Sequence, residues 1–300
     1  MQTRKTYLLH WVCVFLHILT PLFSSAAEYW NRFRGPNGTG IADSTIKLRD
    51  LQKGDIAWKL DLPGKGHSSP VIWGGFLYLT CMNENSSNFH VLSIHRETGN
   101  ISWSREMAYQ TFSKHDFNSF ASPSATVDKD RVYLSWATPK HYFVAALDHA
   151  GEWLWKKDLG PFKSQHGVGV SPVLYQDKLI IANDQLGQSF IVALDKTSGS
   201  TLWKTKRRSD KAAYSTPCVY HRPDGKNQLI VNSAADGVSG LDPDNGKVLW
   251  SYADAFDKRS CSSPIVAGGR IFGSCGSGGG GNFVVAIDPP AGAPQAKPKL

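Results

Sequence analysis

The stretch Ile191–Trp203, which reads IVALDKTSGSTLW, carries the pattern that decides the fold of this 300-residue chain. An apolar run ends at Asp195, Gly199 lies in the polar centre, and Trp203 closes a second apolar piece. This order is typical of a strand, a tight turn and a second strand. Glycine tolerates the positive φ that tight turns require, and Asp accepts hydrogen bonds from the turn backbone.

The same pattern recurs along the chain. In each copy a glycine stands four residues before a tryptophan, and the pairs are Gly99 and Trp103, Gly151 and Trp155, Gly199 and Trp203, and Gly246 and Trp250. A Ser/Thr-Pro pair opens each copy, at Pro70, Pro123, Pro172 and Pro217. The tryptophans return about every 50 residues, which indicates a chain built from repeated units.

Each unit contains four short apolar segments. The third unit reads SPVLYQ, KLIIAND, SFIVALD and STLWKTK, with turn-rich pieces between them and no helical period. Four antiparallel strands in a unit of this length are typical of a propeller blade. A flat sheet of so many strands would leave long exposed edges. We therefore predict an all-β protein, a β-propeller of four-stranded antiparallel blades.

The acidic residue of the motif is predicted to be structural. Asp148, Asp195, Asp242 and Asp288 occupy equivalent positions, and the first unit has His95 there. A catalytic carboxylate is needed once in a site, whereas turn capping is needed in every unit.

The repeat resembles a known family. ALDKTSGSTLW is similar to the Ala-x-Asp-x-x-x-Gly-x-x-x-Trp docking motif of the PQQ-like, or quinoprotein-type, β-propellers, and the resemblance covers residues 54–292. WNRFRGPNGTG, at Trp30–Gly40, looks like the opening segment of exported bacterial members. In that family the indole packs on the glycine turn of a neighbouring blade. The resemblance thus implies blade docking by Trp58, Trp103, Trp155, Trp203 and Trp250, with Gly99, Gly151, Gly199 and Gly246 as platforms.

The first residues predict export. Arg4 and Lys5 precede the apolar run Tyr7–Phe23, and Ser25 and Ala27 are the small residues of a cleavage site, so we expect a cut after Ala27. An uncleaved anchor is the alternative. The expected organisation is a signal peptide at 1–27, an extended segment at 28–53, PQQ-like repeats at 54–292 and a tail at 293–300. A periplasmic or secreted protein without membrane insertion after cleavage is expected.

The ends of the repeat are incomplete. Asp50 and Trp58 have the motif spacing, but too few residues precede them for a whole unit, so a lone fourth strand is expected. At the other end Asp288 is in register, yet Ala296 stands where Trp is due. The chain is therefore expected to contain four complete blades plus partial ones. The lone strand at Trp58 either completes blade five in a closed ring, or the chain is a shortened member of a seven- or eight-bladed family. We favour the shortened chain.

Two functions fit the resemblance. PQQ-dependent dehydrogenases hold their quinone beside calcium, commonly with an adjacent Cys pair and acidic ligands. Here no two of the cysteines beyond the leader adjoin, namely Cys81, Cys218, Cys261 and Cys275, and no compact acidic cluster is present. We therefore expect no catalytic residue, metal or cofactor, and a binding or assembly scaffold similar to non-enzymatic BamB-like members. A dehydrogenase with PQQ and calcium is the alternative.

Partner classes can be narrowed only in part. The chain has a formal charge of +8, but its basic residues are scattered apart from Lys204–Arg208, so nucleic acid is not expected. A protein, a carbohydrate or a small ligand remains open.

Loops that enter the Ser/Thr-Pro starts gather on one face of a propeller, and such loops commonly carry function. Their polar residues differ between units, which favours a recognition site at the channel mouth built around His67, His115, Asn118, Gln165 and His166. Tyr214 has the same position in the fourth unit. The alternative is that these side chains satisfy loop backbone and buried water. The glycine-rich stretch 273–282 predicts a flexible loop, since it lacks a phosphate-binding pattern.

Cys261 and Cys275 flank the AGGR turn at equal distances. Export permits disulfides, and a tight hairpin would bring the two side chains within bridging range. A disulfide and two free thiols both remain open.

Overall fold

The computed structural model describes residues 29–42, 50, 52–209, 211–277 and 280–289. The expected signal peptide, its cleavage site, Gly292 and the tail at 293–300 lie outside these residues. None of the helices within the described ranges has the length and apolar character needed to cross a lipid bilayer.

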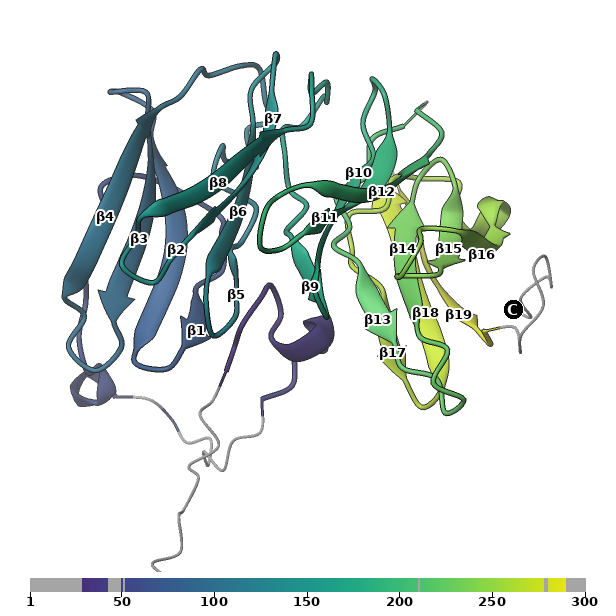
Figure 1. The fold of residues 1–300 in the computed structure, drawn as a ribbon, viewed down its shortest axis with the longest axis horizontal. Coiled ribbons are helices and arrows are strands. Elements are labelled where there is room, and N and C mark those ends of the chain that lie inside the picture. The colour runs from purple at the N-terminus through teal and green to yellow at the C-terminus, as the bar shows by residue number, and fades with distance from the viewer. Residues whose placement is uncertain (1–28, 43–49, 51, 210, 278–279, 290–300) are drawn as a thin grey trace, which may run out of the picture.

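Almost all regular structure is strand, arranged in five antiparallel sheets (Figure 1). Blade 1 contains β1 (Val71–Trp73), β2 (Phe76–Asn83), β3 (Asn88–His95) and β4 (Ile101–Ala108). Blade 2 contains β5 (Thr126–Val127), β6 (Val132–Ala137), β7 (Tyr142–Leu147) and β8 (Trp153–Asp158). Blade 3 contains β9 (Val173–Tyr175), β10 (Lys178–Asn183), β11 (Phe190–Asp195) and β12 (Thr201–Lys206).

Blade 4 contains β13 (Cys218–Tyr220), β14 (Gln228–Ser233), β15 (Gly237–Leu241) and β16 (Val248–Tyr252), and blade 5 contains β17 (Ile265–Ala267), β18 (Arg270–Ser277) and β19 (Gly280–Ile287). The helices are short 3-10 turns, η1 (Pro36–Gly38), η2 (Lys53–Asp55) and η3 (Ala253–Ala255). In every blade the strands pair in chain order. The four blades of four strands and the three strands described for the fifth blade confirm the fold predicted from the repeat.

The apolar core lies between the blades. Between blades 3 and 4, Ile180 and Ile191 pack with Leu229 and Leu241, and all four side chains are fully buried. The third strand of blade 3 is therefore buried on both faces, whereas its fourth strand alternates with solvent. Because each interface resembles a two-layer core, stability comes from contacts between neighbouring sheets.

Four of the motif tryptophans pack on glycine turns of the blade that follows them in the chain; three of them are on fourth strands, and Trp58 precedes blade 1. Trp58 lies on Gly99, Trp103 on Gly151, Trp155 on Gly199 and Trp203 on Gly246. Each indole N–H donates to a carbonyl just before the glycine, and the acceptors are Arg96, His149, Lys196 and Pro243 at 2.8–3.1 Å. All four glycines have positive φ.

Trp250 differs from the other motif tryptophans. Its Nε1 donates to Gln228 Oε1 at 2.8 Å, and its ring lies on Gly240 within the same blade. The glycine that would receive it, Gly292, lies outside the described residues. The docking role expected for Trp250 therefore stays a prediction, while its ring belongs to a buried cluster that also contains Ile271 and Ile287 of blade 5.

The Ser/Thr-Pro pairs also link neighbouring blades. The backbone N–H of Ser124 donates to Ser171 Oγ at 2.9 Å, and that of Ser171 donates to Thr216 Oγ1 at 3.1 Å. Thr216 N–H then donates to Ser263 Oγ at 3.1 Å. Each hydroxyl before a proline therefore accepts a hydrogen bond from a backbone N–H of the preceding blade. That N–H would otherwise be buried without a partner.

Three expectations about local structure need correction. The residues around Trp58 form no strand; instead Trp58 and Leu60 pack on the outer face of blade 1 against Leu79 and Ile94. The described part of the segment at 28–53 is not extended throughout, because it contains η1 and the first residue of η2. The residues around Trp58 do not pair with β19, and in Figure 1 strands β4 and β19 lie at opposite sides. The described chain thus does not close a five-bladed ring in that way.

The disulfide considered between Cys261 and Cys275 is not formed in the structure. The β17–β18 hairpin begins only at Ile265, so Cys261 lies outside the ladder. Cys275 is on β18 opposite Phe283. Equal spacing from the turn therefore did not place the two sulfur atoms on paired strands.

Candidate binding site

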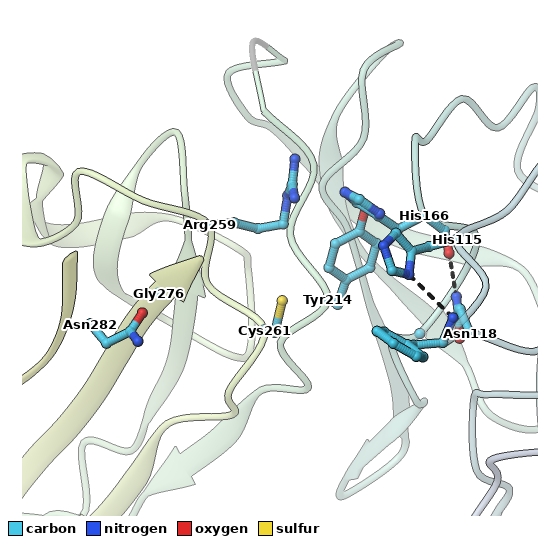
Figure 2. Close-up of a pocket in the computed structure, with 10 residues that line it drawn as sticks. His115, Asn118, His166, Tyr214, Arg259, Cys261, Gly276 and Asn282 are labelled. Atoms are coloured by element: carbon cyan, nitrogen blue, oxygen red, sulfur yellow. Dashed lines mark hydrogen bonds between the residues drawn. The ribbon is translucent and has the colours of Figure 1, made fainter. Parts of the chain in front are cut away.

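Loops that lead into blades 2 to 5 enclose a cavity of about 560 Å³. Its lining residues are His115, Phe117, Asn118, His166, Gly169, Tyr214, Arg259, Cys261, Gly276 and Asn282. Figure 2 shows His115, His166, Asn118 and Tyr214 gathered on one side, with Gly276 and Asn282 on the other. The volume is within the range of small-ligand sites.

Asn118 fixes the two histidine-bearing loops relative to each other. Its Nδ2 donates to the carbonyl oxygens of His166 and Val168, the latter at 3.3 Å. Its Oδ1 accepts from the backbone N–H of Ser119 at 2.9 Å. This amide therefore ties the loop before β5 to the loop before β9.

His166 provides an open hydrogen-bonding position. Its ring centroid lies 5.1 Å from that of His115, and its Nε2 is buried without a hydrogen-bond partner. Burial lowers the pKa of His166, and the charge of Arg259 and the nearby His115 lower it further. The imidazole is thus neutral at neutral pH, and its unpartnered nitrogen is available to a ligand.

Tyr214 forms the wall beside His166. Its hydroxyl lies 2.9 Å from Ser164 Oγ, and its ring meets the His166 ring edge to face at 5.9 Å. Burial raises the pKa of Tyr214, so the phenol stays neutral. The backbone N–H of His166 also donates to Ser164 Oγ, at 3.2 Å. Ser164 therefore holds both rings in place.

Arg259 carries the fixed positive charge of the cavity. Its Nη2 donates to Gln165 Oε1 at 3.0 Å, which links the loop before β17 to the loop before β9. Phe117 is 87% exposed and adds an apolar group to the lining. No carboxylate is among the lining residues that the structure describes. The site thus combines one cation, neutral imidazole and phenol groups, and an exposed aromatic ring.

The structure brings together most of the residues singled out in the sequence. His115, Asn118 and His166 line the cavity, and Gln165 joins it through Arg259. His67 does not line it: the His67 backbone N–H is bound to Ala121 O at 3.1 Å and Ser119 Oγ at 3.0 Å. Its loop leads into β1 and packs against the connection between blades 1 and 2.

Sequence reasoning missed several lining residues, namely Phe117, Arg259, Cys261, Gly276 and Asn282. A signal was present for Arg259, because it precedes the Ser263-Pro264 start of unit five as His166 precedes that of unit three. Gly276 and Asn282 come from the glycine-rich stretch 273–282, which was predicted to be a flexible loop on this face; that prediction is wrong for these two residues, because Gly276 lies on β18 and Asn282 on β19.

A quinone with calcium does not fit this donor set. Calcium takes several oxygen ligands, mainly carboxylates, and no carboxylate is among the described residues that line the cavity. No group of three or more His, Cys, Asp or Glu residues suited to a metal occurs among the described residues.

Comparison with known proteins gives a family match. A family model described as outer membrane protein assembly factor BamB matches residues 140–298. A curated relative, polyvinylalcohol dehydrogenase from Pseudomonas sp, is 22% identical, and the alignment covers 77% of this chain and 41% of that protein.

Solved structures share the fold. Quinohemoprotein alcohol dehydrogenase from Comamonas testosteroni is similar with a TM-score of 0.58 at 17% identity, over 87% of this chain and 46% of that chain. BamB from Moraxella catarrhalis has a TM-score of 0.52 at 18% identity, over 77% of this chain and 64% of that one. The chain spans less than two thirds of each of these relatives, and at such identities the likeness shows the fold.

Proposed function

Because the chain belongs to the family of the outer membrane protein assembly factor BamB, we propose that it is an exported, non-catalytic propeller that acts as a binding or assembly scaffold. The cavity at the channel mouth is its recognition site. The observation that carries this proposal is the cavity itself, which joins loops of four blades and leaves the buried His166 Nε2 unpartnered. A buried polar atom without a partner is rare in folded proteins and suits a ligand.

The distribution of residues supports recognition over catalysis. The framework of glycines, tryptophans and Ser/Thr-Pro pairs repeats, whereas the cavity residues differ from blade to blade. Arg259 and Tyr214 are residue types enriched in protein interfaces, and Phe117 offers an exposed aromatic ring. The family match favours a protein segment as the ligand, with a carbohydrate as the second class.

Replacing Phe117 with the photo-crosslinking residue benzoylphenylalanine should trap the partner in cells of the source organism. We expect a discrete higher-mass adduct on irradiation, because Phe117 is the exposed ring of the cavity. The same residue at Trp153, 42% exposed on the fourth strand of blade 2, should give no such adduct.

Second-site variants make this experiment specific. His166→Ala should reduce the Phe117 adduct at least tenfold, since about 1.4 kcal/mol of lost binding is sufficient for that change. His67→Ala should leave the adduct unchanged, because His67 does not line the cavity. Equal adduct yields from the native cavity and from His166→Ala would contradict the proposed site.

The dehydrogenase alternative rests on the likeness to quinohemoprotein alcohol dehydrogenase. We expect PQQ with calcium chloride to leave the melting temperature of the purified protein unchanged, because the cavity lining contains no carboxylate for the metal. A ligand that binds only the folded state must raise that temperature. A saturable rise of several degrees would therefore favour the dehydrogenase.

A further inference from the structure

The segment that contains the Trp30–Gly40 motif lies across the inner strands of several blades. Trp30 forms a bridge with Ile72 of β1, and the carbonyl of Asn31 accepts from Val127 N–H of β5 at 2.9 Å. Asn37 exchanges two hydrogen bonds with Val219 of β13, at 2.6 and 2.7 Å. In Figure 1 this dark purple segment runs between β5 and β9 and ends beside β13. It is thereby part of the inner surface of the arc.

Within this segment Arg32 is a buried cation without an anion. Only 5% of the residue is exposed, its Nη2 donates to Pro217 O at 2.6 Å, and its Nε is buried with no partner. No carboxylate of the described residues lies within ion-pair distance of it; the buried Arg207, by contrast, faces Asp184 and Asp236. Buried arginines are almost always paired, because an isolated charge is costly to remove from water.

The neighbouring thiol does not neutralise this charge. Burial raises the pKa of Cys218 to about 12, so Cys218 remains protonated and uncharged at neutral pH. Burial likewise lowers the pKa of Arg32, to about 10, which still leaves the guanidinium charged at neutral pH. Arg32 therefore contributes a positive charge that no carboxylate of the described residues pairs.

Arg32 lines a second cavity, of about 410 Å³. Its other walls include the polar side chains of Asn31, Thr126, Tyr175, Gln176, His221 and Asn227, and no carboxylate is among its lining residues. Tyr175 ends β9 and Gln176 follows it in the β9–β10 turn, whereas His221 and Asn227 belong to the β13–β14 connection. The channel-mouth cavity is built at the opposite ends of these inner strands, so the two sites are separate.

The backbone at Gln176 gives an independent sign of a specialised site. Gln176 has φ +53°, a conformation that residues with a side chain rarely adopt. The matching turns of blades 1 and 5 have Gly74 at φ +58° and Gly268 at φ +56°. A strained non-glycine residue in a cavity wall is typical of functional sites.

We propose that this second cavity binds a small carboxylic acid that carries several hydroxyl groups, the chemistry of a sugar acid. The carboxylate pairs with the Arg32 guanidinium, which supplies the missing counter-charge. The amide and phenol groups of Asn227, Gln176 and Tyr175 bind the hydroxyl groups. This inference goes beyond the proposed scaffold function and does not depend on the channel-mouth cavity.

Thermal unfolding of the purified protein with D-glucuronate as the probe tests the proposal. At saturating glucuronate we expect the melting temperature of the native protein to rise by about 5 °C. D-glucose, which keeps the other hydroxyl groups of glucuronate but has a hydroxymethyl group in place of the carboxylate, should cause no rise. Inorganic phosphate should cause a smaller rise than glucuronate; an equal rise with phosphate would overturn the assignment to a hydroxylated acid.

Substitution of Arg32 separates a ligand site from a structural contact. Arg32→Met should abolish the glucuronate shift, while its melting temperature without ligand should equal or exceed that of the native protein, because a lone buried charge is removed. Arg34→Met changes the neighbouring arginine, which does not line the cavity, and should keep the shift.

Three outcomes would overturn the proposal: no glucuronate shift in the native protein, the same shift in Arg32→Met, or a strongly lowered melting temperature of ligand-free Arg32→Met. Should Arg32→Met fail to fold, calorimetric titration of the native protein and of Arg32→Lys with glucuronate decides between the outcomes. Arg32→Lys keeps the charge but loses bidentate geometry, so at least a tenfold weaker affinity is expected. Cross-linking at Phe117 should be unaffected in all of these variants.

Discussion

Gly246→Ala is expected to lower the free energy of unfolding by about 4 kcal/mol. Gly246 has φ +75°, so any side chain there is strained. In addition, a Cβ atom on Gly246 would lie 2.8 Å from Trp203 Cδ2 and 2.6 Å from Thr205 Oγ1. Trp203 is itself buried and bonded to Pro243 O, so the ring cannot move away without losing the docking contact.

Gly225→Ala is the matched control for this substitution. Gly225 has the same φ of +75°, but a Cβ there would have no atom within 4 Å. Gly225→Ala should therefore lower the free energy of unfolding only by the strain of a left-handed alanine, about 1 kcal/mol. Urea unfolding followed by far-UV circular dichroism measures both variants. Equal losses would mean that the indole contact contributes nothing and that the glycine is required for its φ alone.

The blade framework could be predicted because its signals are local. A glycine and a tryptophan four residues apart define one turn and one docking surface, and the same geometry recurs for Gly151, Gly199 and Gly246. Trp250 shows the limit of this reasoning. Its sequence context is the same, but its contacts depend on what the next blade presents, and here it bonds to Gln228.

The sites were less predictable because they depend on tertiary contacts. Position before the Ser/Thr-Pro starts identified His115 and His166, and the same rule applied to unit five would have identified Arg259. His67 fulfils that rule but does not line the cavity, and its backbone N–H is bound to the connection between β4 and β5. Nothing in the sequence around Arg32 shows that its guanidinium would be buried without an acid, since the absence of a partner is a property of the assembled inner surface.

A second large effect is expected at the contact between blades 3 and 4. Arg207→Met should lower the free energy of unfolding by about 3–5 kcal/mol at neutral pH, because it leaves a buried carboxylate unpaired. Arg207 and Asp184 are each only 3% exposed in their side chains, with Arg207 Nε 3.4 Å from Asp184 Oδ1. Arg207 Nη1 also donates to Ser239 Oγ of β15 at 3.2 Å, which joins the two blades.

Arg208 provides the matched control in the next position of the chain. Its Nε pairs with Asp236 Oδ1 at 3.1 Å, but its side chain is 58% exposed. Surface ion pairs contribute little to stability, so Arg208→Met should lower the free energy of unfolding by less than about 1 kcal/mol. A similar loss from both arginines would contradict the view that burial makes the Arg207 contact critical.

The pH dependence identifies the cause of the Arg207→Met loss. Burial raises the pKa of Asp184 above its ordinary value even with Arg207 present, and without Arg207 it must rise further. An acid whose pKa is higher in the folded state takes up a proton on folding, so its destabilising effect fades as pH falls through that pKa. The loss of unfolding free energy in Arg207→Met should therefore be smaller at pH 5 than at pH 7. A loss that is the same at both pH values would point instead to lost packing of the arginine side chain.

The double variant with Asp184→Asn should recover most of the loss at pH 7, because no buried charge remains.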